Sequence, residues 1–194
     1  MNNKKTTIIA EAGVNHNGSI LVAKKLINAA VIAGADIVKF QTFKADSLVT
    51  KLAEKAGYQK VETNKNESQF EMIKKLELDL NAHKKLIKHC ELKGIKFLST
   101  PFDIDSINLL SSLKIPFYKI ASGEITNLPF LRHIASMRKQ VIMSTGMSTL
   151  DEVGLAIKIL LDNGIKKNML TVLQCNTDYP TQMEDVNLNA MLSI

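Results

Sequence analysis

Six short apolar runs along the chain each end in a small cluster of polar residues. The runs cover residues 8–10, 37–38, 95–98, 117–120, 141–143 and 170–173. A helical pattern separates each run from the next. In a barrel of alternating strands and helices, the carboxyl ends of the strands meet at one mouth, and the active site lies there. The pattern therefore predicts an α/β fold, a TIM-type (β/α)8 barrel represented by about its first six βα units.

The segments between the runs carry the start and stop signals of helices. Thr149 followed three residues later by Glu152 is a capping box, and Gly164 is a stop signal. Ser19 and Gly34 bracket the first helical stripe in the same way. The expected helices cover residues 19–34, 68–78, 81–94, 105–113, 128–137 and 149–164, with a last one beginning at Val186.

The connection over residues 44–67 is long, polar and rich in lysine. A connection of this length within a compact domain is usually functional or disordered. Two interpretations stay open at this stage, a lid or substrate loop on the active-site side and a surface insertion.

Six βα units are too few to close an eight-stranded barrel. The alternative is an open doubly wound sheet, which often carries a Gly-x-Gly-x-x-Gly phosphate loop that this sequence lacks. We therefore expect residues 1–194 to form one truncated N-terminal barrel domain that ends before the last two strands. Unpaired parallel edges are an aggregation hazard, so we expect this piece alone to fold poorly and to be inactive.

The composition argues against several classes of protein. The formal net charge is +6, but the lysines are spread over helix faces and aromatic residues make up only 5% of the chain, which argues against nucleic-acid binding. No apolar run approaches the about 20 residues that span a bilayer. The 2 cysteines do not form a disulfide framework. We expect a cytoplasmic protein that binds neither nucleic acid nor membrane.

Two lysines end predicted strands, where an unpaired lysine is uncommon. Lys39 and Lys119 together with Thr100, Ser122 and Ser144 would form a ring of cationic and hydroxyl donors. Such a ring suits a phosphate or a carboxylate. A Schiff-base lysine is the alternative interpretation, because a lysine amine can also attack a carbonyl.

Other residues near the strand ends have both a functional and a structural interpretation. Glu11 could serve acid–base chemistry or orient a hydroxyl, or it could form an ion pair. His16 lies in an Asn-His-Asn-Gly turn and is expected to cap or pack rather than to bind metal. Gly123 and Gly146 could let a ligand approach the backbone or simply form turns. Cys175 is expected to be a small buried residue.

Seven segments in order resemble one family. They are AEAGVNHNG at 10–18, VKFQTFK at 38–44, STPFD at 99–103, KIASGE at 119–124, STGM at 144–147, CNTDYPT at 175–181 and DVNLNA at 185–190. Together they resemble the N-terminal barrel domain of sialic acid (N-acetylneuraminate) synthases, and legionaminic acid synthases are closely similar.

The resemblance implies a transferase of sialic acid biosynthesis. Phosphoenolpyruvate would condense with the open-chain aldehyde of N-acetylmannosamine to give N-acetylneuraminate and phosphate. One alternative is a legionaminic or related nonulosonic acid synthase that uses a diacetamido hexose. A second alternative is a non-catalytic sugar-phosphate-binding protein.

The resemblance also implies roles for individual residues. Phosphoenolpyruvate would be held by Lys39, Thr100, Lys119, Ser122 and Ser144, with Asn176 or Thr177. The sugar would face Glu11, Gln41 and Tyr179, and the catalytic residues would be Glu11, Lys39 and the proton-handling Glu124. Gln174 stands where relatives often have histidine.

The resemblance finally implies features outside this sequence. The family uses a divalent metal, Mn²⁺ or Mg²⁺, whose two histidine ligands are expected beyond residue 194, with no metal ligand within this chain. A C-terminal antifreeze-like domain and a homodimer are also expected of the full-length enzyme.

Overall fold

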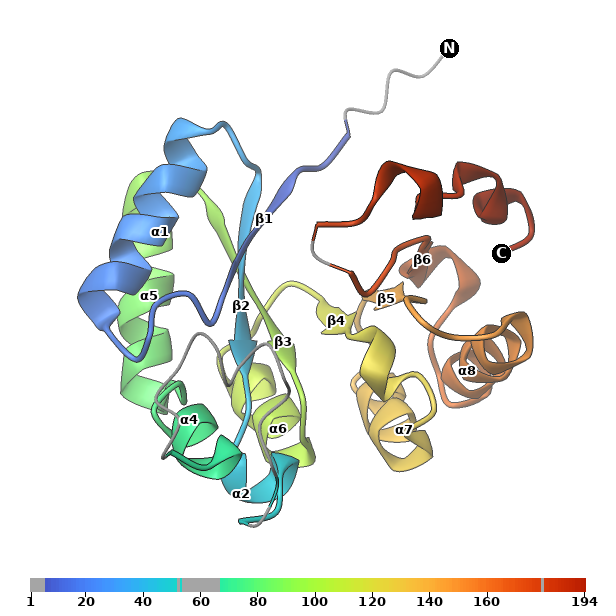
Figure 1. Cartoon of the computed structure of the whole chain (residues 1–194), viewed down its shortest axis with the longest axis horizontal. Helices are drawn as coiled ribbons and strands as arrows, with labels where there is room; N and C mark the ends of the chain where they lie inside the picture. The colour runs from blue at the N-terminus through green and yellow to red at the C-terminus, as the bar shows by residue number, and fades with distance from the viewer. Residues whose placement is uncertain (1–5, 52, 54–66, 179) are drawn as a thin grey trace. The chain divides into compact units, whose positions relative to one another are not determined.

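The computed structural model describes residues 6–51, 53, 67–178 and 180–194 (Figure 1). The chain divides into two compact units, Met1–Ser99 and Thr100–Ile194. The six strands form two separate three-stranded parallel sheets, β1-β2-β3 and β4-β5-β6. The predicted α/β fold with parallel strands in this order is confirmed. The structure does not show the single curved sheet of a closed barrel, so the TIM-type barrel stays a prediction.

The first unit alternates strands with helices. Its elements are β1 (Ile9–Gly13), α1 (Ile20–Ile32), β2 (Ile37–Thr42), α2 (Ala45–Leu48), α4 (Gln69–Lys74), α5 (Leu80–Lys93) and β3 (Lys96–Pro101), whose last two residues pass the boundary. Helices α1 and α5 pack against each other. Along β2, buried Phe40 and Thr42 alternate with half-buried Lys39 and Gln41. Successive strand residues face opposite sides of a sheet, so Lys39 and Gln41 share one face.

The second unit repeats the alternation of strand and helix. Its elements are α6 (Ile104–Ser112), β4 (Tyr118–Ile120), η1 (Ser122–Glu124), α7 (Leu128–Ser136), β5 (Val141–Ser144), α8 (Leu150–Asp162), η2 (Lys167–Met169), β6 (Leu170–Leu173), η3 (Met183–Asp185) and η4 (Leu188–Leu192). Helix α7 packs against both α6 and α8. Its buried residues Phe130, Leu131 and Ile134 recur at helical spacing, which is why this segment is a helix with one face in the core.

Most helices begin at the residue that the sequence signals. Thr149 and Glu152 form the predicted capping box, and the Ser19 side chain accepts from the Val22 N–H. The first expected helix after the long connection is shorter than predicted, because α4 ends at Lys74. The expected helix from Val186 is wrong. The chain there forms the 3₁₀ helices η3 and η4 instead, and Asn187 between them adopts a left-handed backbone with φ +35°.

The long connection over residues 44–67 begins with helix α2. Its central part, residues 52 and 54–66, lies outside the described residues, so both the lid and the insertion remain predictions. Among the helices that the structure describes, none is long and apolar enough to cross a membrane.

Two histidines in the first unit are completely buried. His16 Nδ1 accepts a hydrogen bond from the Gly18 N–H at 3.0 Å, which confirms the predicted turn and packing role. Burial, with a smaller contribution from His83, lowers the pKa of His16. Burial also lowers the pKa of His83, against the opposing effect of Asp79. Both side chains are therefore neutral in the folded protein near pH 7.

We expect acid to destabilise this unit through these histidines. The unfolded chain takes up protons near the ordinary histidine pKa of about 6.5, whereas the folded chain does so only at lower pH. The contribution of these histidines to the free energy of unfolding is therefore at its maximum above that pH, and it falls as the pH drops from 7 to 5. Each pKa unit of difference contributes about 1.4 kcal/mol. Denaturant unfolding at both pH values measures this loss.

His16→Asn keeps an acceptor near the Gly18 N–H and should reduce the loss between pH 7 and pH 5. His133→Gln is the matched control, because His133 bonds Asn108 on the surface. An unchanged pH dependence in His16→Asn would contradict the role of His16.

Candidate functional site

Glu11 and Lys39 face each other across the first two strands. The parallel register places Glu11 opposite Lys39, and Lys39 Nζ forms an ion pair with Glu11 Oε2. The Lys39 side chain is 16% exposed and that of Glu11 is 44% exposed. A strand-end lysine therefore has an anionic partner already in this structure. The ion pair that the sequence left open for Glu11 is present, at a position that a ligand can still reach.

Gly13 brings a third predicted residue into this group. The register between β1 and β2 shifts between Glu11 and Gly13, and Gly13 has φ +53°. A Cβ at Gly13 would lie 3.2 Å from Glu11 Oε1 and 3.9 Å from Gln41 Nε2. The carboxylate and the amide thus lie close together beside backbone that carries no side chain. The sequence did not single out Gly13, because a bulge is visible only in the strand pairing.

Lys119 and Ser144 form the centre of a second group, in the second unit. Lys119 lies in β4 and is 7% exposed. Its Nζ donates to Ser144 Oγ and to the Ile120 carbonyl oxygen, both at 2.6 Å. The ring predicted from the sequence therefore contains at least one direct contact between its cation and a hydroxyl.

Gly146 allows two further predicted residues to approach each other. It has φ +33°, and a Cβ there would lie 2.5 Å from Ser122 Cβ and 3.0 Å from Thr177 Cγ2. Thr177 therefore lies beside Ser122. The neighbouring Asn176 instead donates its Nδ2 to the Asp185 carbonyl oxygen at 2.8 Å. Of the two residues that the sequence could not separate, Thr177 is the one near a predicted donor.

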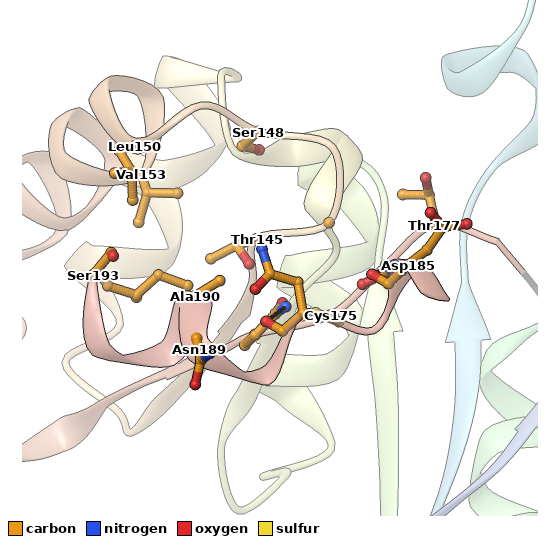
Figure 2. Close-up of a pocket in the computed structure, with 15 residues that line it drawn as sticks. Thr145, Ser148, Leu150, Val153, Cys175, Thr177, Asp185, Asn189, Ala190 and Ser193 are labelled. Atoms are coloured by element: carbon orange, nitrogen blue, oxygen red, sulfur yellow. Dashed lines mark hydrogen bonds between the residues drawn. The ribbon is translucent and has the colours of Figure 1, made fainter. Parts of the chain in front are cut away.

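A cavity of about 570 Å³ adjoins this second group (Figure 2). Its volume is within the range of small-molecule sites. Thr145 and Cys175 lie near its centre, Leu150 and Val153 of α8 lie on one side, and Thr177 lies toward the opposite edge. The C-terminal segment forms another wall, and Gln174 Nε2 holds it by donating to the carbonyl oxygens of Val186 and Asn187 at 3.2 and 3.1 Å.

Cys175 lines this cavity and is only half-buried, so the prediction of a small buried residue is wrong. Its Sγ donates to the Leu173 carbonyl oxygen at 3.4 Å. Burial raises the pKa of the Cys175 thiol, but hydrogen bonds from Ser144 and from the backbone of Gly146 and Thr145, with the charge of Lys119, outweigh it. The net effect places the pKa below the ordinary value of 9.0. The sequence did not predict these surroundings of Cys175, because the groups that contact its thiol lie on other strands and turns.

The other predicted site residues are less informative. Thr100 is buried, and its Oγ1 has no hydrogen-bond partner among the described residues. Glu124 accepts a hydrogen bond from Asn127 Nδ2 at 2.8 Å at the protein surface. Tyr179 lies outside the described residues. The structure thus gathers Glu11, Lys39 and Gln41 in one unit and Lys119, Ser122, Ser144 and Thr177 in the other.

The described part of the chain contains no group of three or more His, Cys, Asp or Glu residues suited to a metal ion. These residues therefore do not fit the expected divalent metal. Mn²⁺ or Mg²⁺, with ligands elsewhere, stays a prediction.

Comparison with known proteins decides the family. Residues 26–194 match the NeuB family. The chain belongs to this family. It is 53% identical to N,N'-diacetyllegionaminic acid synthase of Campylobacter jejuni, over 98% of this chain and 57% of that protein. It is 50% identical to the synthase of the same name from Legionella pneumophila, over 96% of this chain and 53% of that protein.

A solved structure shows a similar fold. The N-acetylneuraminic acid (sialic acid) synthetase of Leptospira borgpetersenii, crystallised with citrate, matches with a TM-score of 0.80 and 28% identity. The match covers 97% of this chain and 61% of that one. This NeuB family chain thus spans about half the length of the curated relatives it matches. The predicted resemblance to sialic acid synthases is confirmed. Of the two acceptor interpretations, the legionaminic alternative fits these relatives better than N-acetylmannosamine.

Proposed function

We propose that the protein containing this chain condenses phosphoenolpyruvate with the open-chain aldehyde of a diacetamido hexose. The products would be N,N'-diacetyllegionaminic acid and phosphate. The part of the proposal that concerns phosphoenolpyruvate rests on the buried contact between Lys119 Nζ and Ser144 Oγ, with Ser122 and Thr177 close by at Gly146. The acceptor half is supported by the two relatives that share at least 50% identity and that name.

In this proposal the second group binds the anionic substrate. Lys119 supplies a positive charge, and the hydroxyls of Ser122, Ser144 and Thr177 supply neutral donors. Hydrogen bonds from an ammonium to phosphate or carboxylate oxygens are about twice as strong as neutral ones. Lys119 is buried, and a charge in such surroundings interacts more strongly with a bound anion than it would in water. Thr100 and Lys39 are proposed to contribute further donors.

The first group is proposed to face the acceptor sugar. Glu11 Oε1 and Gln41 Nε2 both lie within 4 Å of the position that a Cβ at Gly13 would take. A carboxylate and an amide can together accept from a sugar hydroxyl and donate to an acetamido carbonyl. Tyr179 and the catalytic roles of Glu11, Lys39 and Glu124 belong to the same proposal.

The reaction forms one carbon–carbon bond and breaks one carbon–oxygen bond. C3 of phosphoenolpyruvate attacks the aldehyde carbon, and the new alkoxide takes up a proton. Water adds at C2 and loses a proton, which leaves a hydroxyl and the phosphate on the same carbon. The C2–O bond to phosphate then breaks, the C2 carbonyl forms, and the hydroxyl proton passes to the leaving phosphate. Glu124 is proposed to handle a proton in these steps. A homodimer and a C-terminal antifreeze-like domain remain proposals for the full-length protein.

Acceptor choice separates this proposal from its alternatives. The longest natural form of the protein would be given phosphoenolpyruvate with either a diacetamido hexose or N-acetylmannosamine, and phosphate release and product mass would be measured. We expect kcat/KM to be at least about 100-fold higher with the diacetamido hexose, because a site built around a second amide leaves polar groups unpaired when that amide is missing.

Reactions without acceptor are the control for this assay. A preference for N-acetylmannosamine would instead support the N-acetylneuraminate reaction, which the Leptospira structure keeps as the second candidate. Binding of phosphoenolpyruvate without phosphate release from any acceptor would indicate a non-catalytic sugar-phosphate-binding protein.

A further inference from the structure

A continuous chain of buried hydrogen bonds joins the carboxyl ends of β2 and β3 to helix α5. Thr42 Oγ1 lies 2.6 Å from Ser99 Oγ and 2.8 Å from His83 Nε2. His83 Nδ1 lies 2.8 Å from the Asp79 carbonyl oxygen at the start of α5. Ser99 and His83 are completely buried, and Thr42 is 3% exposed.

The chemistry of these groups fixes the direction of the chain. The Asp79 carbonyl can only accept, so His83 Nδ1 carries the proton and His83 Nε2 accepts. The Thr42 hydroxyl therefore donates to His83, and Thr42 Oγ1 accepts from the Ser99 hydroxyl. Burial lowers the pKa of His83, Lys44 lowers it further, and Asp79 raises it. His16, the other buried histidine nearby, is neutral as well. The donor and acceptor roles in this series of hydrogen bonds therefore stay the same near pH 7.

An aromatic layer lies two residues back along the same two strands. The rings of Phe40 in β2 and Phe97 in β3 stack with centroids 5.7 Å apart and an interplanar angle of 18°. The rings of His83 and Phe97 form a T-shaped pair with centroids 6.1 Å apart and an interplanar angle of 79°. Phe40 with Phe97 and Thr42 with Ser99 are thus two successive cross-strand pairs, and His83 contacts Phe97 in the first and Thr42 in the second. A slip of one residue would break both pairs, so they fix the register of β2 and β3.

The alternation along each strand connects this buried layer to the candidate site. Gln41 lies between Phe40 and Thr42 and faces the side that carries Lys39. Thr100 follows Ser99 directly in β3 and faces away from it. Thr42 and Ser99, which are hydrogen-bonded to each other, are the sequence neighbours of Gln41 and Thr100. Their bond therefore restrains the backbone that carries the side chains of Gln41 and Thr100.

We propose that Thr42, Ser99 and His83 are positioning residues that hold Gln41 and Thr100 in the orientation needed for substrate binding. The role rests on the proposed synthase function, because it concerns residues assigned to that site. It adds residues that the sequence did not single out. None of the three touches a substrate in this account, and they act only through the strands that they join.

Thr42→Val tests the chain with little change in side-chain shape. It removes the hydroxyl that donates to His83 and accepts from Ser99, while Thr42→Ser keeps that hydroxyl. The control is Ser106→Ala, because Ser106 is 2% exposed and its Oγ donates to Asp103 Oδ2 at 2.8 Å. The two substitutions should reduce the melting temperature by similar amounts, since Thr42→Val removes two hydrogen bonds between neutral groups and Ser106→Ala removes one stronger hydrogen bond to a carboxylate.

Kinetics and spectroscopy then separate positioning from stability in the longest natural form of the protein. We expect Thr42→Val to lower kcat/KM by about tenfold, mainly through a higher KM, because a small misplacement of binding groups has a large effect on the rate. Thr42→Ser should restore kcat/KM, and Ser106→Ala should leave it unchanged. In ¹⁵N spectra of the histidine side chains, the Nε2 resonance of His83 should move in Thr42→Val alone.

The outcomes are distinguishable. If the unmodified protein releases no phosphate with any acceptor, the proposed function is overturned and the positioning role with it. If the unmodified protein is active and Thr42→Val has the same kcat/KM, the positioning role alone is overturned. Loss of activity in both Thr42→Val and Ser106→Ala, with equal loss of stability, also overturns it, because a general loss of folding then explains the result.

Discussion

Lys119→Met should reduce turnover of phosphoenolpyruvate by at least about 100-fold, the effect expected for loss of a buried charged donor at a reacting anion. Methionine has a similar length and removes the ammonium that donates to Ser144 Oγ and to the Ile120 carbonyl oxygen. Phosphate release gives the rate, and calorimetric titration with phosphoenolpyruvate gives the affinity. Because a buried charge is costly to desolvate, we expect the melting temperature to stay the same or to rise.

Lys139→Met is the matched control for this substitution. Lys139 Nζ also donates to a backbone carbonyl, that of Ile115, at 2.9 Å in the same unit. It has no role in the candidate site, so turnover and affinity should stay at the unmodified level. Equal phosphoenolpyruvate affinity in Lys119→Met and in the unmodified protein would rule out Lys119 as the main anion-binding cation.

Gly146→Ala should abolish detectable turnover and destabilise the second unit by about 1–3 kcal/mol, the range for a strained backbone or an overpacked contact. The new Cβ would lie 2.5 Å from Ser122 Cβ and 3.0 Å from Thr177 Cγ2, at a residue with φ +33°. Ser122 or the turn itself must move, and both belong to the proposed anion site. Denaturant unfolding gives the stability, and phosphate release gives the activity.

Gly154→Ala separates the clash from a general effect of adding a methyl group. Gly154 lies inside helix α8, and a Cβ there would have nothing within 4 Å. It should stabilise the protein by about 0.5–1 kcal/mol, since alanine is the better helix former. Activity should be unchanged. A Gly146→Ala protein with normal kinetics would show that close approach at Gly146 is not needed.

Local features of the fold were predictable because their causes lie within a few residues. The capping box of Thr149 and Glu152 and the helix start after Ser19 depend on neighbours three positions away. The apolar runs gave the strands for the same reason. The 3₁₀ helices after Thr181 were not predicted. Gln174 fixes that segment by bonds to Val186 and Asn187, which are 12 and 13 residues away.

The candidate site was predictable as a set of residue types and only in part as contacts. The pairing of Lys119 with Ser144 follows from two parallel strand ends that lie side by side. The position of Thr177 near Ser122, and the bond from Asn176 to Asp185 nine residues along the chain, did not follow from the sequence. Gly13 was hidden as a point of close approach, and the sequence indicated Gly146 only as a place where a ligand could come near the backbone. Its closeness to Ser122 and Thr177 appears only in the tertiary structure.

The sequence by itself determined the order of strands and helices, the polar character of the strand ends and the family to which they are similar. Those properties follow from the periodicity of apolar residues, from capping residues and from short motifs. Only the tertiary structure decided which side chains meet. Thr42 bonds His83, 41 residues away, and Ser99, 57 residues away. Such contacts depend on strand register, because a one-residue change in register would turn every side chain of the strand to the opposite face of the sheet.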